Sequence, residues 1–237
     1  MVSQTDYINL EVIQEAGQVL VTGTDTGIGK TWTTVKIIEG LRHAGREVFA
    51  VKPLETGCES GINDQLVGAD ISKIAAALDI SSDQPDYQEL YFQLFRSPVA
   101  PAVAVKREDS TFDWSELVSW LKEQKSKRDL LLVEGAGGLL VPIAENRTYA
   151  ELATETALKT LVVFGSRLGA INQAALTFEV LRARGLPVLG YVFNEISPAE
   201  TALEGTVNAD QTNRELLKEV AARYEINEIG YLSWEVK

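Results

Sequence analysis

The feature that most constrains the fold is the alternation of short apolar runs with stretches of helical spacing. The apolar runs are of strand length and uninterrupted, which predicts strands buried on both faces. Alternation of strands and helices predicts an α/β fold with a mostly parallel sheet and helices on both faces. The expected strands are 18–23, 47–54, 129–136, 160–166, 188–196 and 228–232, and the clearest expected helices are 30–45, 113–127, 170–185 and 213–224.

The length of 237 residues fits one domain, because α/β folds of ~200–250 residues often form a single unit. Hydrophobic residues make up 45% of the chain and charged residues 24%, which is enough apolar material for a sizeable core. We expect a single domain over 18–237, preceded by a short extension over 1–17. The span 81–111 is the least regular part and is expected to form loops with a helix between them.

The charge balance argues against several classes of partner. A formal net charge of -12 predicts repulsion from nucleic acid and from anionic membrane surfaces. The single cysteine, Cys58, and the single histidine, His43, do not form a disulfide framework or a zinc site of His/Cys type. Neither a secretory start nor a run of about 18 apolar residues is present, so we expect a cytoplasmic protein without nucleic-acid or membrane partners.

The stretch VTGTDTGIGKT, residues 21–31, has the composition of a phosphate-binding loop between a strand and a helix. Its glycine lies one place early, because Thr24 occupies the position of the first Walker A glycine and Gly23 precedes it. Backbone N–H groups at a helix N-terminus bind phosphate, and the helix dipole favours it. Lys30 is expected to bind the phosphates and Thr31 to offer its hydroxyl to Mg²⁺.

Two further charged residues are expected at the same edge of the sheet. Lys52 follows the second expected strand, and Pro53 breaks that strand and directs the lysine toward the crevice. Glu134 ends a buried strand, and burying a carboxylate without a partner costs several kcal/mol, so a cation is the expected neighbour. The small residues 135–138 suit either close approach to a ligand or a packing turn.

Four stretches taken together resemble the dethiobiotin synthetase family: VTGTDTGIGKT, KPLETG, LLLVEGAGGLLVPI and the segment 166–195. The resemblance runs from about Gln18 to the C-terminus, and the family's own phosphate loop carries its glycine one place early. It implies a P-loop NTPase-like three-layer domain and an ATP- and Mg²⁺-dependent ligase of biotin biosynthesis. The implied reaction closes a ring on 7,8-diaminopelargonic acid with CO2, through a carbamate and a carbamic-phosphoric anhydride, giving dethiobiotin, ADP and phosphate. It also implies a homodimer.

The resemblance assigns roles to individual residues. Lys52 and Lys30 match catalytic lysines, and Thr31, Asp70 and Glu134 match Mg²⁺ ligands, with Asp64 a rival to Asp70. Asn194 matches the adenine contact, while Glu195 and Ser233 depart from the aspartate and proline common in the family. The implied nucleotide contacts are Gly27, Ile28, Gly29, Lys30, Thr31, Trp32, Glu134, Gly135, Ala136, Gly137, Asn194, Glu195 and Ser233. The implied substrate contacts are Thr26, Lys52 and Thr56, together with Gly169, Ala170, Ile171 and Asn172 across the dimer interface.

Two other classes share this style of loop. The ParA and MinD partitioning ATPases carry a lysine five residues before the invariant lysine, where this chain has Asp25. Amidation enzymes of the cobyrinic acid synthase type usually carry a glutaminase domain with a cysteine nucleophile and a histidine, and this chain has no histidine after His43. Both classes are less consistent with the residues than the ligase is.

Overall fold

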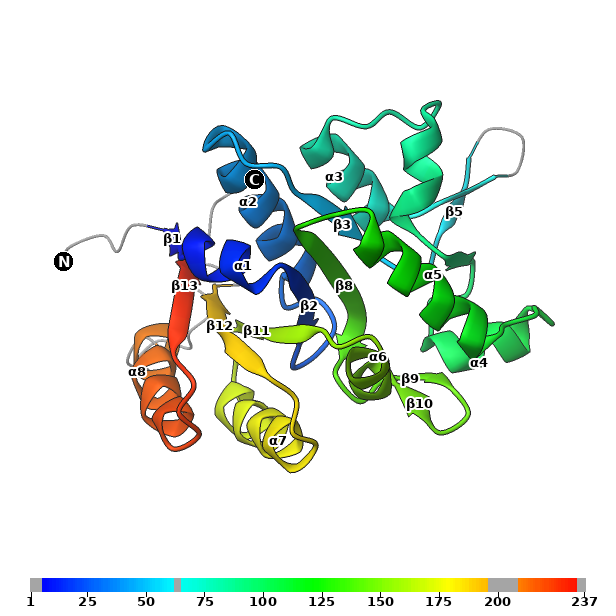
Figure 1. The fold of residues 1–237 in the computed structure, drawn as a ribbon. Helices are drawn as coiled ribbons and strands as arrows, with labels where there is room; N and C mark the ends of the chain where they lie inside the picture. Colours follow the sequence, from blue (N-terminus) through cyan, green and yellow to red (C-terminus); the bar gives the residue numbers. More distant parts are fainter. Residues whose placement is uncertain (1–5, 62–64, 196–208, 234–237) are drawn as a thin grey trace.

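A computed structural model describes residues 6–61, 65–195 and 209–233 of the chain. Its centre is a seven-stranded sheet with the strand order β1-β13-β12-β11-β2-β8-β3. The neighbouring strands run parallel, apart from β1, which pairs antiparallel with β13 at one edge (Figure 1). The predicted α/β class and the mostly parallel sheet are confirmed. The strands are β1 (Tyr7–Ile8), β2 (Gln18–Gly23), β3 (Phe49–Val51), β8 (Leu131–Gly138), β11 (Lys159–Gly165), β12 (Val188–Asn194) and β13 (Glu228–Leu232).

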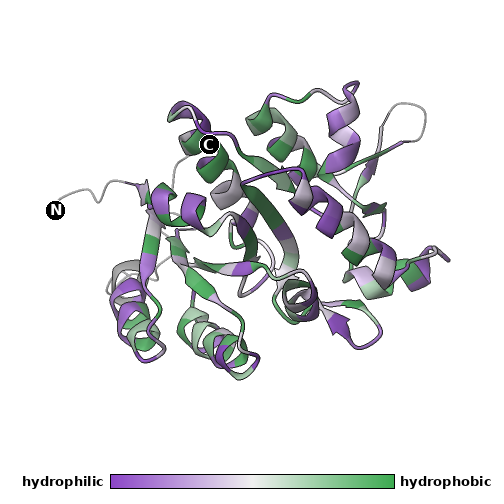
Figure 2. Ribbon diagram, viewed as in Figure 1, coloured by the Kyte–Doolittle hydropathy of each residue, from purple (hydrophilic) through white to green (hydrophobic). Residues whose placement is uncertain are grey.

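Helices cover both faces of the sheet. Residues of α1, α2 and α3 pack into one apolar core, whereas residues of α5, α6, α7 and α8 pack into the other. Figure 2 shows β8 and β12 largely in the hydrophobic colour, while the outer helices α5 and α8 carry hydrophilic residues as well. The helices are α1 (Leu10–Ala16), α2 (Lys30–His43), α3 (Ala69–Leu78), α4 (Pro101–Arg107), α5 (Trp114–Ser126), α6 (Tyr149–Glu155), α7 (Ala170–Ala183) and α8 (Ala209–Ala222).

The continuous apolar strands feed both cores because successive side chains of a strand point to opposite faces. In β11, Val162 and Phe164 enter the core beneath α5 to α8, and Leu161 and Val163 enter the core beneath α1 to α3. All four side chains are fully buried. This is the arrangement that the uninterrupted apolar runs predict.

Short pairs of strands stand beside the main sheet in the described part of the chain. The irregular span 81–111 contains a 3-10 helix, a strand and α4. The sequence predicts the loops and a helix in this span but not the strand. These elements are the parallel pair β4 (Leu54–Thr56) and β7 (Gln93–Phe95), the antiparallel pairs β5 (Glu59–Ser60) with β6 (Leu66–Val67) and β9 (Pro142–Ala144) with β10 (Arg147–Thr148), and the 3-10 helix η2 (Pro85–Leu90).

Several expected boundaries differ from the structure. The expected strand 47–54 divides at Lys52 and Pro53 into β3 and β4, which belong to different sheets. The strand expected over 129–136 runs instead over Leu131–Gly138, because Gly138 still pairs with Gly23 of β2. The last expected helix, 213–224, begins earlier, at Ala209.

The extension expected over 1–17 joins the fold from residue 7 onward. Strand β1 adds to the sheet edge, and helix α1 places the fully buried Ile13 in the core beside α2. Asp6 accepts hydrogen bonds from the backbone N and from Oγ of Ser233 at the other end of the chain. No helix among the described residues combines the length and the apolar character that crossing a membrane requires.

Candidate active site

The phosphate-binding loop joins β2 to α2 and leaves the start of that helix open. Helix α2 begins at Lys30, and its N-cap, Gly29, has φ 89° and offers no side chain to cap the first N–H groups. Asn194, at the end of β12, lies directly beneath this turn and donates from Nδ2 to the carbonyl of Ile28 at 2.9 Å. A Cβ at Gly29 would lie 2.0 Å from that Nδ2. The turn therefore requires glycine for both its conformation and its packing.

Lys52 lies at the centre of a buried polar network at the carboxyl ends of the strands. Its Nζ donates to Asp70 Oδ2 at 2.7 Å and to Glu134 Oε1 at 2.8 Å. Thr31 Oγ1 donates to the same oxygen of Glu134 at 2.7 Å. The side chains of Lys52 and Glu134 are 4% and 0% exposed. The structure thus brings together residues from the phosphate loop, from the break after β3, from α3 and from β8.

The pKa values in this network follow from burial and neighbouring charge. Burial alone would lower the pKa of Lys52, but the charges of Glu134 and Asp70 outweigh it and raise the pKa above its usual value. Burial raises the pKa of Asp70, while Lys52, by its charge and hydrogen bond, holds the net value below the usual range. Burial and then the positive charge of Lys52 lower the pKa of Lys30 to about 8. The neighbouring carboxylates therefore favour the charged form of Lys52, whereas burial and Lys52 disfavour the charged form of Lys30.

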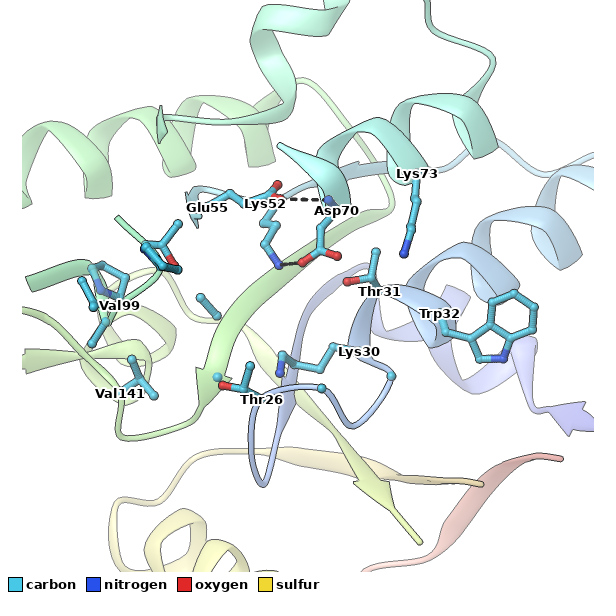
Figure 3. A pocket seen from close by; sticks show the side chains of 18 residues that line it. Thr26, Lys30, Thr31, Trp32, Lys52, Glu55, Asp70, Lys73, Val99 and Val141 are labelled. Carbon is cyan, nitrogen blue, oxygen red and sulfur yellow. Dashed lines mark hydrogen bonds and ion pairs between the residues drawn. The ribbon is translucent and has the colours of Figure 1, made fainter. Parts of the chain in front are cut away.

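A cavity of about 670 Å³ opens above this network (Figure 3). Thr31, Lys52 and Asp70 lie at its polar end, and Val99 and Val141 lie on the opposite side in the figure. The predicted site residues that line it are Thr26, Gly27, Gly29, Lys30, Thr31, Trp32, Lys52, Thr56, Asp70, Ala136 and Gly137.

Other predicted site residues are not among those that line this cavity. Glu134 lies fully buried beneath it, and Ile28 points its side chain into the core and faces the loop through its backbone. Gly135 packs against the ring of Tyr149. The remaining residues lie at the ends of β12 and β13 or at the start of α7: Asn194, Glu195, Ser233, Gly169, Ala170, Ile171 and Asn172. Asp64, the rival to Asp70, lies outside the described residues.

Sequence reasoning missed two contacts that shape the site. Asp25, in the phosphate loop, forms an ion pair with Arg167 and accepts a hydrogen bond from Gln173 Nε2 at 3.3 Å, which ties the loop to the start of α7. Glu55 accepts hydrogen bonds from the backbone N–H groups of Asp70 and Ile71 at the start of α3. A carboxylate in the middle of the KPLETG stretch was the available signal for Glu55.

The residues present fit a magnesium ion and a polyphosphate. Thr31, Asp70 and Glu134 supply the oxygen ligands that Mg²⁺ prefers. The second carboxylate oxygen of Glu134, Oε2, is buried and has no hydrogen-bond partner among the described residues. Among the described residues, we find no group of three or more His, Cys, Asp or Glu side chains that could hold a metal ion by itself. Mg²⁺ usually keeps several waters and binds substrate phosphates as well.

A parallel sheet, a phosphate loop that opens a helix, and a lysine and two carboxylates at the carboxyl edge define a P-loop nucleotide-binding protein. A family model described as an AAA domain matches residues 17–234. Among solved structures, the MinC:MinD cell division protein complex of Aquifex aeolicus has a TM-score of 0.51 at 15% identity, over 92% of this chain and 81% of that one. This likeness concerns the fold alone.

Curated relatives give the particular family. The ATP-dependent dethiobiotin synthetase BioD of Anaeromyxobacter sp. is 39% identical, over 74% of this chain and 75% of the relative. The proteins of the same name from Nitrosospira multiformis and Aquifex aeolicus are 36% and 34% identical, over 80% and 86% of this chain and 80% and 84% of the relatives. The chain belongs to the ATP-dependent dethiobiotin synthetase family.

Proposed function

We propose that this chain is an ATP- and Mg²⁺-dependent dethiobiotin synthetase that closes the ureido ring on 7,8-diaminopelargonic acid. The observation that carries the proposal is the position of Lys52, whose ammonium faces the cavity beside Lys30 while Asp70 and Glu134 hold it in place. Ring closure needs no side-chain nucleophile. It needs cations fixed where oxygens become negatively charged, and this site supplies them.

In the proposed reaction the phosphate loop binds the triphosphate of ATP. The open N-terminus of α2 directs its first N–H groups toward the phosphates, and Lys30 adds a charge at the same place. Its Nζ already donates to the carbonyl of Asp25 at 2.8 Å, which keeps the side chain over the loop. Thr31, Asp70 and Glu134 would hold Mg²⁺, which would neutralise the charge that develops on the phosphates.

Lys52 is proposed to act on the carbamate. One amine of the diamine and CO2 give a carbamate, whose oxygen attacks the γ-phosphoryl group to form the mixed anhydride and ADP. The second amine then attacks the carbonyl carbon and expels phosphate. Lys52 would orient the carbamate oxygen and stabilise the negative charge at each step, because it is buried, ionised and fixed by two carboxylates.

The lining of the cavity supports a substrate that carries polar groups next to an alkyl chain. Thr26 and Thr56 line the cavity and offer hydroxyl groups to a ligand, whereas Pro98, Val99 and Val141 offer an apolar wall for an alkyl chain. Asn194 is proposed as an adenine contact. Its Oδ1 is buried and has no hydrogen-bond partner among the described residues, so a donor on the base would satisfy it.

We further propose a homodimer in which the segment 166–173 of each copy meets the substrate bound to the other. Leu168 in this segment is 99% exposed, and Leu176, one to two turns into α7, is 58% exposed. Burying these two leucines against a second copy would remove apolar surface from water, which favours such an interface. Light scattering should give a dimer for the native chain, and Leu176→Glu should shift it toward the monomer. A native monomer at micromolar concentration would contradict this part of the proposal.

The function is tested by measuring phosphate release with ATP, Mg²⁺ and bicarbonate, with and without the diamine. Release that depends on the diamine, together with dethiobiotin detected by mass spectrometry, is the expected result. Release that ignores the diamine would instead favour a switch ATPase, which hydrolyses ATP to change its partners.

A further inference from the structure

The helix that carries Asp70 begins without a cap of its own. The N-cap of α3 is Gly68, which has no side chain, so the first N–H groups of the helix need acceptors from elsewhere. Glu55, on β4, supplies them. Its Oε1 accepts from the N–H of Asp70 at 2.8 Å and its Oε2 accepts from the N–H of Ile71 at 3.0 Å.

This contact is buried and closely packed. Glu55 is 5% exposed and lines the same cavity as Lys52 and Asp70, and Figure 3 shows it reaching across to the backbone of Asp70. A Cβ at Gly68 would lie 2.3 Å from Oε2 of Glu55 and 2.6 Å from its Cδ. Glycine at residue 68 thus leaves the space that the carboxylate occupies.

The backbone contact with Glu55 and the side-chain contact with Lys52 are both made by Asp70. The first-turn N–H that Glu55 binds belongs to Asp70 itself, and the carboxylate of Asp70 then reaches Lys52 Nζ at 2.7 Å. Glu55 also lies three residues after Lys52, so one short stretch of chain positions both partners. We propose that Glu55 is a positioning residue that fixes Asp70 for metal binding, an inference that rests on the proposed role of Asp70 as a Mg²⁺ ligand.

The chemistry of a carboxylate suits this role better than that of an amide. An ionised carboxylate offers acceptors on both oxygens, whereas glutamine offers one acceptor oxygen and an NH₂ group that would face an N–H donor. Glu55→Gln should therefore keep one of the two contacts, and Glu55→Ala should lose both. Gly68→Ala leaves Glu55 unchanged chemically but displaces it, so it tests the same contact independently.

The test is a titration with Mn²⁺ in the presence of a nonhydrolysable ATP analogue, with free Mn²⁺ followed by electron paramagnetic resonance. Glu55→Ala should raise the dissociation constant of Mn²⁺ about tenfold, since loss of a group that orients a metal ligand typically costs 10–100-fold in affinity. Glu55→Gln should give a smaller rise, and Gly68→Ala a rise comparable to Glu55→Ala. If Glu55→Ala does not fold, the other two variants decide the question in the same way.

Asp113→Ala is the matched control. Asp113 Oδ1 likewise accepts from two first-turn N–H groups, those of Ser115 and Glu116, but at the start of α5, and Asp113 is not among the residues that line the cavity. Its loss should leave Mn²⁺ affinity unchanged. Wild-type affinity in the Glu55 and Gly68 variants, or an equal loss in Asp113→Ala, would overturn the inference. The titration contains neither diamine nor bicarbonate, so a failed carboxylation assay would not affect its outcome.

Discussion

Replacing Lys52 by methionine removes the ammonium but nearly preserves the length of the side chain. Glu134, which is fully buried, would lose its ionic partner, and Asp70 would lose its hydrogen bond at 2.7 Å. Breaking a buried ion pair by removing one partner costs about 3–5 kcal/mol. For a chain of this size 1 kcal/mol corresponds to about 2–4 °C in melting temperature, so Lys52→Met should lower it by roughly 6–20 °C.

Thermal unfolding followed by circular dichroism, with and without Mg²⁺, measures this effect. Excess Mg²⁺ should restore part of the lost stability, because a divalent cation can neutralise the carboxylates that Lys52 leaves unpaired. Lys73→Met is the matched control, since Lys73 lines the same cavity but is exposed, and it should change stability by less than about 0.5 kcal/mol. In the enzyme assay Lys52→Met should reduce turnover far more than nucleotide binding. An unchanged melting temperature, or equal losses in both variants, would refute the reasoning.

The remaining predictions concern the phosphate loop. Burial lowers the pKa of Lys30 to about 8, so this lysine loses its charge as pH rises through 8, and the nucleotide dissociation constant should then rise by about tenfold per pH unit. Calorimetric titrations from pH 7 to 10 measure this, and a flat profile would contradict it. Gly29→Ala should abolish nucleotide binding, because its Cβ would collide with Asn194. Gly27 has φ 73° and open space around its Cβ, so Gly27→Ala should cost only about 1–2 kcal/mol in stability. Equal nucleotide affinities in the two variants would show that the collision is relieved. Thr31→Ala should raise the Mg²⁺ concentration needed for half-maximal activity, while ATP binding without metal stays as in the wild type.

The sequence predicts those parts of the fold and site that depend on local patterns. Uninterrupted apolar runs identify the parallel strands, because burial on both faces leaves no alternation. Lys52 lies directly after β3, and Lys30 and Thr31 open the helix that follows β2. The carboxyl ends of parallel strands meet at one edge of the sheet. Their convergence could therefore be predicted without knowing the strand order.

Contacts between distant segments could not be predicted in this way. Asp25 and Arg167 are separated by 142 residues, and Tyr7 of β1 pairs with Tyr231 of β13 from the opposite end of the chain. The periodicity of one segment carries no information about its partner. The cap that Glu55 provides is a contact of the same kind. It forms only because the start of α3 lies beside β4, although the two are 15 residues apart in the chain.

The central claim is that this site activates a carbamate by transferring the γ-phosphoryl group of ATP to it. A short reaction with C¹⁸O₂, ended before the label exchanges with water, tests it most directly, with the released phosphate analysed by mass spectrometry. The mechanism predicts that each phosphate carries one oxygen from CO2, since the carbamate oxygen that attacks the γ-phosphoryl group leaves with phosphate at ring closure. Phosphate free of ¹⁸O, formed at the same rate as dethiobiotin, would contradict the account.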